Sequence, residues 1–136
     1  MEKGIRVLLV DDEVSFTQTM AFWFESKGCS VTTAHDGQSA LDVIQSNPPD
    51  IVFLDLNMPI MDGVETLKHL RKINKDLPVI IISAYLDDQK KMLEIRQQGI
   101  SGVFYKGKDF DKCLSLLETA LRRHKNLKKE DEPAED

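Results

Sequence analysis

The stretch IVFLDLNMPIMDG, residues 51–63, decides the fold. Its first four residues are apolar, and such a short run rich in β-branched and aromatic side chains predicts a strand buried on both faces. Asp55 ends that strand, and Pro59 with Asp62-Gly63 marks a loop instead of a helix. In open α/β sheets, ligands bind at the carboxyl edge of the strands. Asp55 is therefore placed where chemistry is expected.

Strand and helix patterns alternate on both sides of this stretch. The remaining strands are predicted at 5–10, 31–34, 79–82 and 103–105. The helices are predicted from residue 14 to a stop at Gly28, and at 37–46, 64–73, 87–98 and 109–124. This alternation is typical of the α/β class, a doubly wound, five-stranded parallel sheet with five helices on its two faces.

Size and composition predict one domain, at residues 1–124, followed by a charged, disordered tail or linker start at 125–136. The net charge of −5 argues against direct binding to nucleic acid or to an anionic membrane. Cys29 and Cys113 stand apart, without metal-site spacing, and are read as reduced residues of a cytoplasmic protein. The apolar run before Asp11 is too short for a signal peptide or a membrane span.

Polar residues follow each strongly apolar strand: Asp11-Asp12, Asp55, Ser83 and Lys106. The carboxyl ends of parallel strands meet at one edge, so these residues are expected to lie together. Three clustered carboxylates repel one another unless a cation joins them, and an all-oxygen ligand set suits Mg²⁺. A carboxylate beside Mg²⁺ can attack phosphorus, and a lysine can neutralise the charge of the transition state.

These residues resemble those of the response-regulator receiver domain of two-component signalling, which has the CheY-like, flavodoxin-like fold. The matching motifs are Val10-Asp11-Asp12, residues 55–63, Ser83-Ala84, Gly99 and Lys106, in the family's order and spacing across about residues 4–124. The resemblance implies the strand order 2-1-3-4-5. It also implies a Mg²⁺-dependent phospho-acceptor that switches protein–protein interactions and is not otherwise an enzyme.

The resemblance assigns a role to each site residue. Asp55 would be the phospho-acceptor, Lys106 would pair with it or with its phosphoryl group, and Ser83 would turn toward a phosphoryl oxygen. The Mg²⁺ ligands it implies are Asp11 (through water), Asp12, Asp55 and the backbone carbonyl of Asn57. The phosphoryl donor would be a sensor histidine kinase or a phosphotransfer protein, and the output protein is not identified. The resemblance leaves open a homodimer through the last helix and its neighbours, because receivers often pair there.

Two positions depart from the family pattern. The aromatic residue usual three positions before the lysine is Val103 here, and Tyr105 lies on the same strand face by alternation. The proline that usually follows the lysine is Gly107. Both changes lie where this family contacts its output partners, so an atypical output is expected. Asn57 and Tyr85 flank the site and, in this family, tune the rate of phosphoryl loss.

Three rival functions stay open. A Mg²⁺ phosphohydrolase would use an acid two residues after the nucleophile, where this chain has Asn57. A phosphate-independent, receiver-like docking module is suggested by Val103 and Gly107. A flavodoxin-like cofactor binder is disfavoured by the acidic crevice. The basic run 122–125 resembles a DNA-binding patch, but the acidic residues that follow it would repel DNA, so direct contact with DNA is not expected.

Overall fold

The computed structural model describes residues 4–84 and 89–131. Five parallel strands form one sheet in the order β2-β1-β3-β4-β5, which confirms the predicted α/β fold. The strands are β1 (Arg6–Val10), β2 (Ser30–Ala34), β3 (Ile51–Asp55), β4 (Val79–Ser83) and β5 (Gly102–Tyr105).

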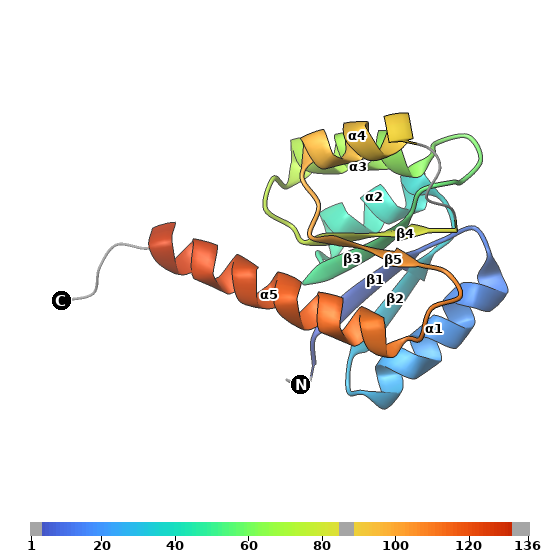
Figure 1. Cartoon of the computed structure of the whole chain (residues 1–136), viewed down its shortest axis with the longest axis horizontal. Helices are drawn as coiled ribbons and strands as arrows, with labels where there is room; N and C mark the ends of the chain where they lie inside the picture. Colours follow the sequence, from blue (N-terminus) through green and yellow to red (C-terminus); the bar gives the residue numbers. More distant parts are fainter. Residues whose placement is uncertain (1–3, 85–88, 132–136) are drawn as a thin grey trace.

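Five helices cover the two faces of the sheet. They are α1 (Val14–Ser26), α2 (Gly37–Ser46), α3 (Gly63–Ile73), α4 (Gln89–Gln98) and α5 (Asp111–Asp131). Figure 1 shows α1 and α5 on one face and α2, α3 and α4 on the other. This arrangement follows from crossover connections between parallel strands, which carry each helix over one face or the other.

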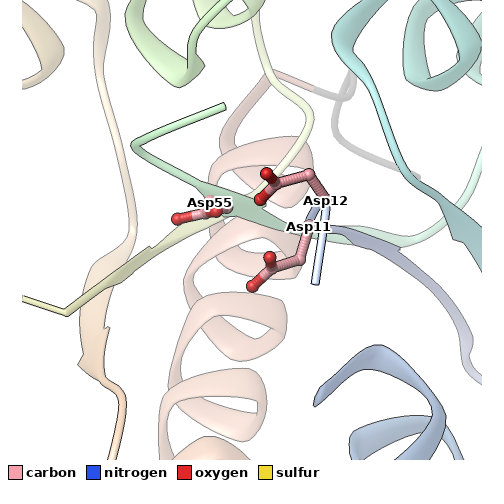
Figure 2. A group of neighbouring side chains, drawn as sticks. All are labelled: Asp11, Asp12 and Asp55. Carbon is pink, nitrogen blue, oxygen red and sulfur yellow. The ribbon is translucent and has the colours of Figure 1, made fainter. Parts of the chain in front are cut away.

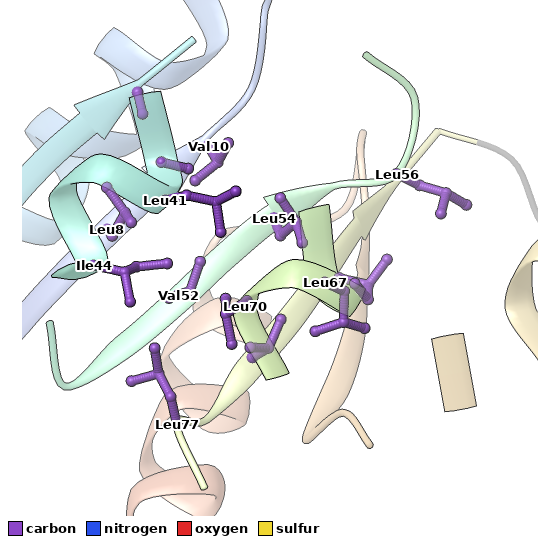
Figure 3. Packing of buried hydrophobic residues seen from close by; sticks show 14 of the residues in the cluster. Leu8, Val10, Leu41, Ile44, Val52, Leu54, Leu56, Leu67, Leu70 and Leu77 are labelled. Carbon is purple, nitrogen blue, oxygen red and sulfur yellow. The ribbon is translucent and has the colours of Figure 1, made fainter. Parts of the chain in front are cut away.

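Burial separates the inner strands from the edges. All residues of β3 and β4 are buried, whereas β2 is exposed at most of its positions. Side chains alternate between the faces, so Leu8 and Val10 pack under α2 and α3 (Figure 3), and Val7 and Leu9 pack under α1 and α5. These two apolar layers hold the central strands rigidly and place their carboxyl ends at one edge.

Local sequence signals set the helix ends. Asp36 and Asp62 are the N-cap residues of α2 and α3, and their side chains accept hydrogen bonds from Ser39 N at 2.7 Å and Glu65 N at 2.9 Å. Gly28 follows α1 with a φ of 94°, a left-handed conformation that glycine adopts without strain. The predicted stop at this glycine is confirmed.

The last helix is longer than the sequence pattern predicts. An end near His124 and a disordered tail at residues 125–136 are expected, but α5 continues to Asp131. The added segment holds lysine, leucine and glutamate, which favour helix, and no glycine or proline occurs before Pro133. Residues 132–136 and the predicted helix start at 87–88 lie outside the described residues.

Membrane-spanning segments are absent from the described helices. None of them, within residues 4–84 and 89–131, combines the length and the apolar character that crossing a membrane requires.

Candidate functional site

Three carboxylates meet at the carboxyl edge of the sheet. Asp11 and Asp12 follow β1, and Asp55 ends β3; the register pairs Val10 with Leu54, so the next residues of the two strands are neighbours. One oxygen from each carboxylate lies within 4.8 Å of the others (Figure 2). The structure therefore brings together the three acids that the sequence analysis grouped.

The environment of Asp55 disfavours its charged form. Asp55 and Asp11 are buried, with 4% and 0% of their surfaces exposed, whereas Asp12 is exposed. Loss of water and the negative charge of Asp11 raise the pKa of Asp55 from its ordinary 3.8 to about 7, although Lys106 and the Asn57 N–H act in the opposite direction. Without a cation, this carboxyl group is partly protonated at neutral pH.

Lys106 brings a positive charge to the acids from the end of β5. Its Nζ lies 2.8 Å from Asp11 Oδ2 and 3.2 Å from Glu13 Oε1, and 4.8 Å from the centre of the Phe16 ring. Burial alone would lower the pKa of Lys106, but Asp11, Asp55 and Glu13 raise it above its ordinary value. The lysine is therefore charged, and it forms ion pairs with Asp11 and Glu13, just before α1.

The acidic cluster fits a divalent cation. Asp11 Oδ2 is buried and, among the described residues, accepts no hydrogen bond of good geometry; its contact with Lys106 is an ion pair. The ammonium group of Lys106 offsets part of the cost of burying this charge, and the clustered negative charge of three acids favours a further cation. Together with Asp12 and Asp55, Asp11 offers oxygen ligands only, the donor set that suits Mg²⁺.

Asn57 contacts Asp55, and Ser83 ends the neighbouring strand. The Asn57 N–H donates a hydrogen bond to Asp55 Oδ1 at 3.3 Å, and its side chain is exposed on the loop after β3. Ser83 is fully buried at the end of β4, and its carbonyl oxygen accepts a hydrogen bond from Lys106 N at 2.9 Å. Tyr85, which the sequence analysis placed beside the site, lies outside the described residues.

The loop after Asp55 depends on Gly63. A Cβ atom at this position would lie 2.3 Å from the Asp55 carbonyl oxygen and 2.8 Å from Leu56 Cα. Since both neighbours are backbone atoms, they could not move without displacing the acceptor. Gly63 also begins α3 directly after its cap Asp62, so this glycine keeps the helix start against the carboxyl end of β3.

Val103 and Tyr105 differ in their surroundings. Val103 is part of the apolar layer under α4, where Met92 and Ile95 also pack. Tyr105 is half-buried and pairs in register with Ser83, on the strand face that Val103 shares. An aromatic residue beside Ser83 is thus present, but two residues further along the strand than the family pattern has it.

Gly107 directs the chain away from β5 along a path that proline could not follow. Its φ is 92°, whereas proline is restricted to about −65°. We expect Gly107→Ala to lower the free energy of unfolding by about 1–2 kcal/mol, because a side chain is strained in this conformation. Urea unfolding measures this change, with Lys108→Ala as the neighbouring control. Equal stability of wild type and Gly107→Ala would show that this loop adapts without strain.

Two site residues escaped the sequence analysis. Glu13 pairs with Lys106, and Lys91 of α4 contacts Asn57 and Asp62. The only sequence signal for Glu13 is its position directly after Asp11-Asp12. Nothing in the sequence indicates that the Lys91 side chain reaches a loop more than 25 residues earlier.

Comparison with known proteins supports one family. The family model of the response regulator receiver domain matches residues 7–118. The chain is 33% identical over 122 residues to Response regulator MprA of Mycobacterium tuberculosis, an alignment that covers 90% of this chain and 53% of that protein. It therefore spans about half the length of the curated relatives it matches.

Solved structures give the same result. A Francisella response regulator 1452 receiver domain superposes with a TM-score of 0.79 at 34% identity, covering 88% of this chain and 98% of that one. The chemotaxis protein CheY4 of Vibrio cholerae superposes with a TM-score of 0.80 at 30% identity, covering 86% of this chain and 98% of its own. The fold is shared with these proteins.

Proposed function

Because the chain belongs to the response regulator receiver domain family, we propose that Asp55 accepts a phosphoryl group in a two-component phosphorelay. The observation that carries the proposal is the setting of Asp55. It is a buried carboxylate at the carboxyl edge of a parallel sheet, with Asp11, Asp12 and Lys106 around it. Acids packed this closely are costly, and binding a cation and a phosphoryl group would account for them.

The proposed step is a transfer between two nucleophiles. A carboxylate oxygen of Asp55 attacks the phosphorus, an O–P bond forms, and the P–N bond of a donor phosphohistidine breaks while its imidazole nitrogen takes up a proton. Lys106 places positive charge beside the equatorial oxygens, which carry the charge of the loose transition state. Mg²⁺, when bound to Asp11, Asp12, Asp55 and the Asn57 carbonyl, would neutralise the phosphoryl charge.

The partners follow from this chemistry. A sensor histidine kinase or a phosphotransfer protein would supply the phosphoryl group, and an output protein or a further domain would respond to it. We propose that the chain turns over no other substrate, since Asn57 cannot serve as the general acid or base that a phosphohydrolase would have two residues after Asp55. A second candidate, a docking module that never takes phosphate, rests on Val103 and Gly107.

The proposal is tested with a small phosphoryl donor. We expect acetyl phosphate with Mg²⁺ to add one phosphoryl group per chain, seen by intact mass, and chelation of the metal to prevent it. The same preparation should release no phosphate from a phosphomonoester such as p-nitrophenyl phosphate. Steady turnover of that ester would favour the phosphohydrolase instead.

A further inference from the structure

Helix α4 is attached to the domain by a small apolar contact and by several polar links. Within its described span, Gln89–Gln98, Ile95 is the buried side chain. Arg71 of α3 donates hydrogen bonds to the carbonyl oxygens of Gln98 at 3.2 Å and Gly99 at 2.8 Å, at the C-terminal end of α4. A helix with so little apolar burial is expected to have low local stability, so each polar link affects its position.

Two lysine links tie α4 to the elements beside it. Lys68 Nζ of α3 lies 3.5 Å from Glu94 Oε2, and this pair connects helix to helix. Lys91 Nζ of α4 lies 3.3 Å from Asn57 Oδ1 and 3.5 Å from Asp62 Oδ2. We call this second group, Lys91 with Asn57 and Asp62, the Lys91 bridge.

The Lys91 bridge ends on the loop that carries the acceptor. Asn57 donates its backbone N–H to Asp55 Oδ1, and Asp62 caps α3 just before Gly63, which packs on the Asp55 carbonyl. The Lys68–Glu94 pair has the same chemistry and the same separation but contacts no residue of this loop. Of these two lysine links, only the Lys91 bridge connects α4 with the surroundings of Asp55.

Val103 occupies the position that usually holds a switching aromatic residue, and its side chain offers no polar link between α4 and the acceptor loop. Val103 is an aliphatic side chain packed in the apolar layer with Met92 and Ile95. It has no polar group that could respond to a change of charge at the edge of the sheet. A charged group that touches both α4 and the acceptor loop can respond to such a change, and Lys91 does both.

We infer that the Lys91 bridge transmits the phosphorylation state of Asp55 to α4; this rests on the proposed function. A phosphoryl group carries about −1.5 to −2 charges in place of the single charge of the carboxylate. The added negative charge attracts the Lys91 ammonium and strengthens its hold on the loop. The first turn of α4 is then held closer to the acceptor edge in the phosphorylated protein than in the unmodified one.

Hydrogen exchange of the α4 amides tests the inference, with Lys91→Gln compared to the matched control Lys68→Gln. In the unmodified proteins, both substitutions should speed exchange in α4 by roughly two- to five-fold, since each removes one ion pair that solvent reaches. After acetyl phosphate and Mg²⁺, exchange in the first turn of α4 should slow in wild type and in Lys68→Gln. In Lys91→Gln it should stay unchanged, although the adduct forms.

The intact mass of each sample separates the outcomes. If Lys91→Gln takes the adduct and its α4 exchange slows as much as that of wild type, the inference is overturned and the proposed function stands. Loss of the α4 response in both variants would also overturn the inference. Any weakening of the helix would then be enough to abolish the response, whether or not it involved the Lys91 bridge. If wild type takes no adduct, the proposed function fails and the inference falls with it.

Discussion

Lys106→Gln is expected to slow formation of the Asp55 adduct by about 100- to 1000-fold, the usual cost of removing one group that stabilises charge in a transition state. Lys106 is the cation that contacts Asp11 at 2.8 Å and acts on Asp55 electrostatically. Glutamine retains a hydrogen-bond donor but no charge. The rate is measured by intact mass against time with acetyl phosphate and Mg²⁺.

Lys108→Gln is the control for this experiment. Lys108 has the same charge, lies two residues further on and is exposed, so its loss should leave the rate within a factor of about two. Circular dichroism would verify that both variants are folded. Equal rates for Lys106→Gln and Lys108→Gln would remove Lys106 from the proposed mechanism.

Asp55→Asn is expected to stabilise the metal-free protein at pH 8 by about 2 kcal/mol. Each unit by which a pKa is raised corresponds to roughly 1.4 kcal/mol, and solvent at the edge of the sheet screens part of this penalty. The cause is the loss of water around Asp55 and the adjacent charge of Asp11, which together raise its pKa to about 7. Asparagine retains the shape of the aspartate side chain without its charge, but it cannot accept the phosphoryl group.

The pH dependence has a definite sign. The pKa of Asp55 is raised in the folded state, so folding favours the protonated form, and this contribution to stability is lost as the pH rises from about 4 to 7. In urea unfolding with a chelator, the advantage of Asp55→Asn should therefore grow from pH 5 to pH 8. Added Mg²⁺ should reduce it. If the two proteins lost stability in parallel as the pH rises, the pKa of Asp55 would not be raised by folding.

The fold and the cluster of acids are predictable because they depend on strand order and on alternation. Uninterrupted apolar runs predict β3 and β4, which are fully buried. Parallel strands place their carboxyl ends at one edge, so the amino-acid sequence alone is enough to group Asp11, Asp12, Asp55, Ser83 and Lys106. The end of α1 at Ser26 follows from Gly28, and the end of α2 at Ser46 follows from Pro48-Pro49.

The partners of long, flexible side chains could not be predicted from the sequence. Lys106 contacts Asp11 and Glu13, and Lys91 contacts Asn57 and Asp62. The partner of a long, flexible side chain depends on its rotamer and on nearby charges, which strand order and alternation do not give. The prediction for the end of α5 is wrong for a different reason. A charged segment suggests disorder, although its residues are good helix formers on a helix that has already begun.

The central claim is that Asp55 takes the phosphoryl group, and intact mass after acetyl phosphate and Mg²⁺ tests it most directly when wild type is compared with Asp55→Asn. We predict one adduct on wild type, its absence without Mg²⁺, and its absence on Asp55→Asn under all conditions. An adduct on Asp55→Asn equal to that on wild type would contradict the claim. So would a wild-type protein that takes no adduct, and the chain would then be a phosphate-independent docking module.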